Sequence, residues 1–166
     1  MASDHTLLLL RHAQAADFVP GGRDHERPLT DYGIDQAREV GDAIRARGLT
    51  IDQVYCSTAT RTRQTWNALG LNSPCEFTDD IYNAGSDSLR EQVLLIEEQV
   101  RTAMIIGHGP GLPRLAVELA GPDSDQRSLD VINSRYPTAT LARIDLPGPW
   151  SELQVGRLSW VRLGSR

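Results

Sequence analysis

The sequence contains no lysine; all 17 of its basic residues are arginine. Mechanisms that need a lysine Schiff base or the lysine of a phosphate-binding P-loop are therefore excluded. Cysteine is also scarce, since Cys56 and Cys75 are the only two, and their spacing matches neither a zinc site nor a Cys-x-x-Cys redox motif. We therefore expect two free thiols, no metal site and no cofactor.

Long apolar runs and an excess of positive charge are missing too. The run Leu7–Leu10 has only four leucines, whereas a membrane span needs about 18 apolar residues, and no basic segment of a signal peptide precedes it. The 22 acidic residues outnumber the basic ones and give a net charge of −5, which speaks against a nucleic acid or an anionic membrane as partner. These absences predict a cytoplasmic protein.

The length of 166 residues predicts a single domain over 1–166 that can bury a core. Short apolar runs alternate with helical patterns, which is typical of an α/β fold with a largely parallel sheet. Thr30 can cap the first helix, and Ser57 or Thr58 can cap the second, which ends near Gly70. Helices are predicted at residues 31–47, 59–70, 86–100 and 111–120. Strands are predicted at residues 6–10, 52–57, 75–77, 102–107, 138–145 and 153–163, the last two as an antiparallel edge pair.

Two of the apolar runs stop at a histidine. Leu7–Leu10 leads into Arg11 and His12, and Met104-Ile105-Ile106 leads into Gly107 and His108. A histidine after one strand is most often an ordinary loop residue, but the chain has only four histidines and two of them lie here. Since ligands bind at the carboxyl ends of strands in open α/β sheets, neighbouring strands would bring His12, His108 and Arg11 together. That combination predicts an anion site with a nucleophile.

A second arginine suits the same site. Arg61 lies in the first turn of the helix after the second strand, where free N–H groups and the helix dipole attract anions. Arg61 and Arg63 could also form a solvated helix face, yet two arginines in a first turn are unfavourable without an anion nearby. Arg11 and Arg61 would bind a phosphoryl group through their planar guanidinium groups. Their positive charge would also lower the pKa of His12 and keep its imidazole neutral and nucleophilic. His108 would donate a hydrogen bond to the phosphoryl oxygens as negative charge develops on them.

These segments together resemble the histidine phosphatase superfamily, which has the phosphoglycerate-mutase-like fold. The resemblance rests on Arg11-His12-Ala13, on Arg61 in its Ser57–Thr65 context and on Gly107-His108, with Ala13 where the superfamily usually has glycine. The segments Arg27–Gly33 and Tyr136–Ala139 are similar to the small SixA-type phosphohistidine phosphatases. The resemblance covers residues 7–153 and implies a three-layer α/β fold, with helices on both faces of a largely parallel central sheet.

The resemblance also implies roles for individual residues. His12 would be the phosphate-accepting nucleophile of a metal-independent phosphatase, with Arg11, Arg61 and His108 completing the phosphate pocket. Further substrate contacts are predicted for Gln14, Arg23 and Gly109. Arg23 and Arg27 could instead form surface ion pairs within their charged loop. The substrate would be a phosphorylated protein, carrying phosphohistidine, or a small phosphorylated molecule.

The sequence departs from the mutase-like members in one respect. Those members have a carboxylic general acid between the second arginine and the second histidine, whereas this chain reads Asp79-Asp80-Ile81-Tyr82-Asn83-Ala84-Gly85 there. Asp79 or Asp80 could serve, or the acid could be missing, which matters least when the leaving group is an imidazole. A phosphatase for small phosphomonoesters stays open as an alternative, as does a phosphate-binding scaffold without activity; a metal hydrolase is disfavoured by the lack of ligand spacing.

Overall fold

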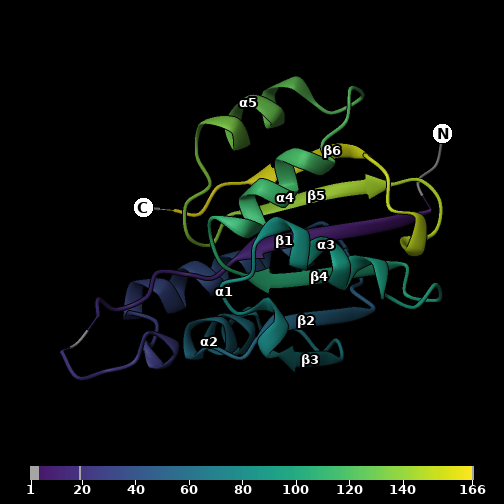
Figure 1. Ribbon diagram of the computed structural model, residues 1–166. Coiled ribbons are helices and arrows are strands. Elements are labelled where there is room, and N and C mark those ends of the chain that lie inside the picture. The colour runs from purple at the N-terminus through teal and green to yellow at the C-terminus, as the bar shows by residue number, and fades with distance from the viewer. Residues whose placement is uncertain (1–3, 19, 166) are drawn as a thin grey trace.

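The computed structural model describes residues 4–18 and 20–165. At its centre lies one six-stranded sheet in the order β3-β2-β4-β1-β5-β6 (Figure 1). The strands β3, β2, β4 and β1 are parallel, whereas β5 and β6 are antiparallel to their neighbours. The predicted parallel sheet with an antiparallel edge pair is therefore confirmed. The strands are β1 (His5–Arg11), β2 (Gln53–Ser57), β3 (Cys75–Thr78), β4 (Thr102–Gly107), β5 (Leu141–Leu146) and β6 (Arg157–Arg162).

Helices cover both faces of the sheet, which confirms the three-layer α/β arrangement. One face is covered by α1 (Asp31–Ala46) and α2 (Thr60–Leu69), and the other by α3 (Ser86–Leu94) and α4 (Gly111–Leu119). The last helix, α5 (Gln126–Ser134), packs beside α4 and β6. In the described part of the chain, none of these helices has the length and apolar character needed to cross a membrane.

The leucine run of β1 supplies the core of both layers. Successive side chains of a strand point to opposite faces, so Leu8 and Leu10 pack under α1 and α2, whereas Leu7 and Leu9 pack under α3 and α4. All four side chains are completely buried. This explains why the run is continuously apolar rather than alternating, as expected of a strand covered on both sides.

The start of α1 is held against the loop that follows β1. The Thr30 hydroxyl accepts a hydrogen bond from the Gly33 amide at 3.0 Å, so the predicted cap is confirmed. A Cβ atom on Gly33 would lie 2.1 Å from the carbonyl oxygen of Gln14, so only glycine allows this approach. The buried Gln36 side chain adds a second link, because its Oε1 accepts from the Gln14 amide at 2.8 Å.

The sheet has a topological switch point between β1 and β4. The chain leaves β1 toward α1 on one face and leaves β4 toward α4 on the opposite face. The two connections diverge beyond the carboxyl ends of adjacent strands, which is where α/β sheets form their ligand crevices.

Two local predictions are wrong, and one helix is not predicted. The third helix ends at Leu94 rather than near residue 100. The segment after it leaves the helical path and makes long-range contacts instead, since the Val100 carbonyl accepts from the indole N–H of Trp150 at 2.8 Å. No helix is predicted at α5, although the Asp125 carboxylate accepts from the Ser128 amide and caps it. Neither predicted hydroxyl caps α2, whose N-cap is Ala59.

Candidate active site

The two predicted histidines meet at the carboxyl ends of β1 and β4. Arg11 pairs with Gly107 at the last position of the parallel ladder, and the His12 amide donates to the Gly107 carbonyl at 3.0 Å. The imidazole rings of His12 and His108 follow directly, with their centroids 5.4 Å apart. The expectation that these strands are neighbours, and that both histidines reach one sheet edge, is confirmed.

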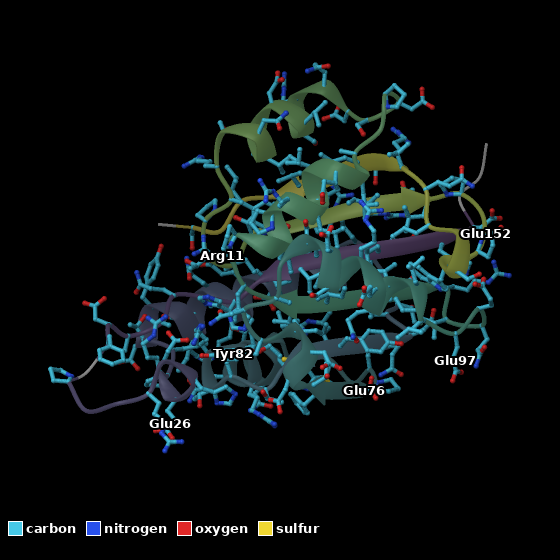
Figure 2. All side chains as sticks on the ribbon, in the orientation of Figure 1. Arg11, Glu26, Glu76, Tyr82, Glu97 and Glu152 are labelled. Atoms are coloured by element: carbon cyan, nitrogen blue, oxygen red, sulfur yellow. The ribbon has the colours of Figure 1, made fainter. Side chains whose placement is uncertain are left out.

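A cleft of about 370 Å³ opens at this edge. Figure 2 labels Arg11 and Tyr82, which lie at this end of the sheet. All four residues of the predicted phosphate pocket line the cleft. The complete lining, within the described residues, is Arg11, His12, Gln14, Ala15, Asp24, Arg27, Arg61, Asn83, His108, Gly109 and Thr138.

The surroundings of His12 leave one ring nitrogen free to act as a nucleophile. Its Nδ1 lies 2.7 Å from the carbonyl oxygen of Ala13, which can only accept, so Nδ1 carries the proton and Nε2 has the lone pair. Burial, together with the positive charges of Arg61, Arg11 and Arg27, lowers the pKa of His12 to about 4. The imidazole is therefore neutral at pH 7.

His108 is bonded through its other nitrogen. Its Nε2 lies 2.8 Å from the hydroxyl oxygen of Ser57, at the end of β2. Burial, followed by the charge of Arg61, lowers the pKa of His108 to about 3. Both histidines of the cleft are thus neutral at pH 7, but they differ in which nitrogen is occupied.

Each cleft arginine is anchored at one side of its guanidinium group. Arg11 donates from Nη1 to the Tyr136 carbonyl at 2.8 Å. Arg61 is 3% exposed and donates to the Asp24 carbonyl at 2.9 Å and to the Asp24 carboxylate at 3.2 Å. Since the backbone and Asp24 fix these planes, the guanidinium groups need little reorganisation when an anion binds.

Three buried nitrogen atoms of the cleft residues have no hydrogen-bond partner among the residues that the structure describes. They are Nε of Arg11, Nε of Arg61 and Nδ1 of His108. Both guanidinium nitrogens are obligatory donors, and buried polar groups of folded proteins are nearly always paired. A group of such atoms around one cleft therefore favours an acceptor-rich ligand, such as a phosphoryl group.

Asp24 belongs to the site although its sequence context does not reveal it. Its carboxylate accepts from the Tyr82 hydroxyl at 2.6 Å, from Arg61 and from Arg27 at 3.1 Å. The Tyr82 hydrogen bond and the two arginines hold the pKa of Asp24 well below its usual range, so the group is a permanent anion at neutral pH. The only sequence signal is its place three residues before Arg27. Asn83, 3.4 Å from Arg61, has no such signal.

Two of the three residues predicted as further substrate contacts lie in the cleft. Gln14 and Gly109 line the cleft, whereas Arg23 is exposed and is not part of the lining. Arg27 forms the ion pair with Asp24 that was the alternative interpretation, and it also lines the cleft. Arg23 is thus placed as a residue of the loop surface.

The acidic pair between Arg61 and His108 is placed outside the cleft. Neither Asp79 nor Asp80 contributes to the lining, and the Asp79 carboxylate accepts from the Thr58 hydroxyl. Arg63 also points elsewhere: its Nε donates to the Thr58 carbonyl at 2.8 Å and its guanidinium lies 4.3 Å from the Phe77 ring centroid. Across residues 4–18 and 20–165, no group of three His, Cys, Asp or Glu side chains is placed to hold a metal ion.

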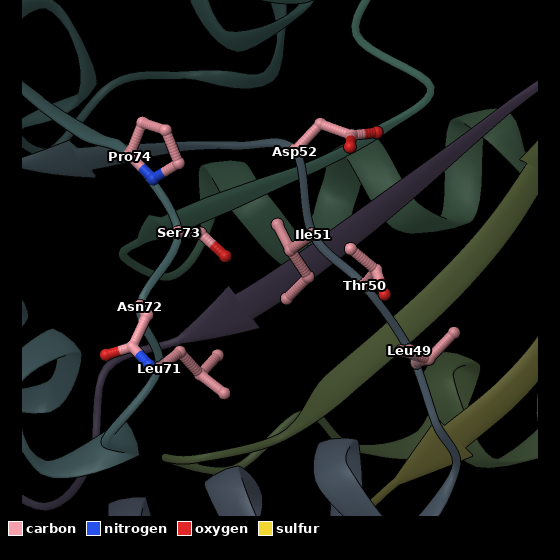
Figure 3. A pocket seen from close by; sticks show the side chains of 8 residues that line it. All are labelled: Leu49, Thr50, Ile51, Asp52, Leu71, Asn72, Ser73 and Pro74. Carbon is pink, nitrogen blue, oxygen red and sulfur yellow. The ribbon is translucent and has the colours of Figure 1, made fainter.

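A second pocket, of about 450 Å³, lies at the amino ends of β2 and β3 (Figure 3). Its lining has one charged residue, Asp52, whose carboxylate accepts from the amides of Arg101 and Thr102 at 3.0 and 2.9 Å. The remaining lining residues are Leu49, Thr50, Ile51, Leu71, Asn72, Ser73 and Pro74. The lining of this pocket contains no histidine and no arginine, so it offers neither an imidazole nucleophile nor a guanidinium group for a phosphoryl ligand.

The sequence of this chain is similar to those of known proteins. Residues 7–86 match the family model of the histidine phosphatase superfamily (branch 1). The chain belongs to the histidine phosphatase superfamily. An uncharacterised protein of Mycobacterium tuberculosis is 33% identical over 148 residues, which are 89% of this chain and 93% of that protein.

Two solved structures share the superfamily fold over nearly the whole chain. A candidate phosphohistidine phosphatase SixA from Nakamurella multipartitia is 33% identical with a TM-score of 0.85, and the match covers 98% of this chain and 97% of that one. A second candidate SixA, from Agrobacterium tumefaciens, is 29% identical with a TM-score of 0.82, covering 96% and 98%. The phosphoglycerate-mutase-like fold is therefore confirmed, and membership of the superfamily supports phosphatase activity.

Proposed function

We propose that this protein is a metal-independent phosphatase that forms a phosphohistidine intermediate on His12 and acts on phosphohistidine in a partner protein. One observation carries the proposal: Nε2 of a neutral His12 shares a cleft with buried nitrogens of Arg11, Arg61 and His108 that have no hydrogen-bond partner in the described part of the chain. This set supplies a nucleophile together with donors for the phosphoryl oxygens.

In the first step, Nε2 of His12 attacks phosphorus, and the bond between phosphorus and the leaving nitrogen breaks. The leaving imidazole keeps that electron pair and departs as a neutral group once it has received a proton from water. Arg11 and Arg61 neutralise the negative charge on the equatorial oxygens, and His108 donates a hydrogen bond to one of them. In the second step, water attacks the phosphorus on His12, which releases inorganic phosphate and restores the neutral ring.

The acid–base inventory of the cleft favours an N–P bond over an alkyl ester. Asp24 is the only carboxylate among the described lining residues, and its depressed pKa keeps it ionised at pH 7. It therefore has no proton to donate to an alkoxide. An imidazole leaves readily after protonation by solvent, so the lack of a general acid affects it least.

Two features support a protein as the substrate. The loop that follows β1 contributes Ala15 and Asp24 to the cleft lining and also carries the exposed Phe18 and Arg23, which can meet another protein. In addition, the two SixA structures that share 33% and 29% identity with this chain are named as candidate phosphohistidine phosphatases.

The test is a comparison of kcat/KM for a phosphohistidine protein, phosphoramidate, an aryl phosphate and an alkyl phosphate, all with EDTA present. We expect the alkyl ester to be about 100- to 10,000-fold worse than the N–P substrates, the usual contribution of general acid catalysis, and the aryl ester to fall between. Equal rates on the alkyl ester would contradict the proposal and favour a phosphatase for small phosphomonoesters. Phosphate binding without turnover of any substrate would indicate a scaffold instead.

A further inference from the structure

Ser57 lies at the junction between β2 and the cleft, and the function proposed above gives it no role. It is the last residue of β2 and is completely buried. Cys56 pairs with Ile106 in the ladder between β2 and β4, so Ser57 follows beside Gly107. This register places its side chain next to His108.

The hydrogen bonds of Ser57 define where its proton lies. Its Oγ is 2.8 Å from Nε2 of His108 and accepts from the Ala59 amide at 3.3 Å. A hydroxyl has one proton to donate, and the Ala59 amide offers no lone pair. Within the described residues, Nε2 of His108 is thus the one hydrogen-bond acceptor beside the Ser57 hydroxyl.

If the Ser57 hydroxyl donates to Nε2, the neutral ring of His108 carries its proton on Nδ1. Nδ1 is the nitrogen without a partner in the described residues, and His108 lines the cleft. A proton there makes a donor for a phosphoryl oxygen. The other tautomer would present a lone pair, which repels an anion.

We propose that Ser57 is a positioning residue that holds His108 in the tautomer protonated at Nδ1, and so makes a neutral imidazole a hydrogen-bond donor to the substrate. This role rests on the proposed phosphatase function. The hydroxyl also suits a later stage, because it can rotate and accept from Nε2 if the ring takes up a proton from solvent, a change that the negative charge of the phosphoryl group favours. Ser57 can therefore hold His108 in one place in both protonation states.

The role also explains why Ser57 does not cap α2 as the sequence predicts. A cap hydroxyl would accept from an amide of the first turn, at N2 or N3. The Ser57 hydroxyl instead contacts His108, and the amide it accepts from belongs to Ala59, the N-cap residue itself. The start of α2 therefore lacks a side-chain cap and presents Arg61 to the cleft.

The direct test is the tautomer of His108, read from ¹⁵N chemical shifts of the histidine-labelled protein at pH 7. We expect wild type to show Nδ1 protonated and Nε2 as an acceptor, and Ser57→Ala to show a mixture of tautomers or the opposite one. The Nδ1 proton should exchange with solvent more slowly in wild type and in Ser57→Thr, which keeps the hydroxyl, than in Ser57→Ala. A wild-type ring protonated at Nε2, or an unchanged ring in Ser57→Ala, would overturn the proposal.

Kinetics with an aryl phosphate supply the second readout. Ser57→Ala should lower kcat by up to about 100-fold, since small misplacements of a catalytic group have effects of that size, and should change KM much less. Ser57→Thr should restore much of kcat. The matched control is Thr140→Val, which removes another completely buried hydroxyl, one that accepts from the Gly164 amide at 3.1 Å rather than contacting His108.

Thermal unfolding of both variants separates positioning from stability. If Thr140→Val lowers kcat as much as Ser57→Ala at equal loss of Tm, the effect is structural and the proposal is wrong. A wild-type protein that turns over no phosphorylated substrate would refute the phosphatase function, whereas the chemical shifts would still decide whether Ser57 sets the tautomer of His108.

Discussion

His12 and His108 occupy equivalent positions at the ends of two adjacent parallel strands, and yet the fold prepares them for different chemistry. Both rings are buried, and burial lowers the pKa of both. His12 is held at Nδ1 by a carbonyl oxygen, which leaves Nε2 as a lone pair. His108 is held at Nε2 by a hydroxyl, which leaves Nδ1 without a partner among the described residues.

The difference shows that a histidine's place at a strand end does not define its role. The role follows from the hydrogen-bond partner of the other nitrogen, because that partner sets the tautomer and the ring orientation. A carbonyl can only accept and fixes one tautomer, whereas a hydroxyl can donate or accept. Variants that remove either ring, or a charge beside it, therefore test this difference.

Replacing the proposed nucleophile should have the largest effect. His12→Asn removes the atom that would accept the phosphoryl group, so we expect turnover to fall on the order of 10⁶-fold, as for a deleted covalent nucleophile. Acid-labile phosphate on the protein, trapped by quenching the reaction, should disappear. Far-UV circular dichroism should show that the variant is folded. Trapped phosphate at wild-type levels in this variant would remove His12 from the mechanism.

Replacing the partner histidine should slow the reaction without removing the intermediate. His108→Asn deletes one donor to the developing charge, and such deletions cost about 100- to 1,000-fold in kcat. Phosphate should still be trapped on His12 in this variant. If only KM changes, His108 contributes to ground-state binding, and the role assigned to it in the transition state is wrong.

The two arginines of α2 offer a matched pair. Arg61→Gln should also lower kcat by about 100- to 1,000-fold, because Arg61 lies in the cleft. Arg63→Gln changes charge equally but removes contacts with Thr58 and Phe77 at the protein surface. Its kcat should remain near that of wild type, and an equal loss in both variants would contradict the assignment.

Acid should destabilise the protein through the neutral histidines. The pKa of His12 is about 4 in the folded protein and 6.5 in its unperturbed state. Between these values the unfolded chain binds a proton that the folded protein excludes, so the stabilisation is complete above pH 6.5 and is lost as the pH falls toward 4. The loss is about 3 kcal/mol, since one pKa unit corresponds to about 1.4 kcal/mol.

Urea unfolding between pH 7 and pH 4 measures this loss, with His12→Asn as the reference. Asparagine does not titrate, so the free energy of unfolding should depend less steeply on pH in the variant. Parallel curves for the two proteins would show that His12 titrates in the folded protein as it does in the unfolded chain.

The smallest effect concerns the anion beside Arg61. Asp24→Asn removes a negative charge from the cleft, and we expect inorganic phosphate to inhibit roughly fivefold more strongly, since a charge pair at 4 Å in water is worth about 1 kcal/mol. Asp123→Asn, at an exposed position in the connection between α4 and α5, makes the same change of charge and should have no such effect. Weaker inhibition in Asp24→Asn would mean that Asp24 acts mainly by holding Arg61 in place.

The sequence alone determined the elements that build the site. The leucine run of β1 and the apolar run of β4 are long enough and apolar enough to be strands covered on both faces, and each leads within two residues to a histidine. Thr30 caps α1 by a contact three residues away. These features depend on neighbours in the chain, so hydrophobic period and local hydrogen bonding predict them.

His12 is held by the carbonyl of the adjacent Ala13, but only the tertiary structure decided what the other three side chains of the phosphate pocket contact. Arg11 is anchored by a carbonyl 125 residues away, Arg61 by Asp24 at a separation of 37, and His108 by Ser57 at a separation of 51. These partners follow from the strand order and from the path of the loop after β1. Local sequence patterns do not fix either of these, because the same patterns are compatible with other strand orders and other loop paths. The sequence therefore indicated which residues reach the sheet edge, and long-range packing determined their protonation, orientation and charge.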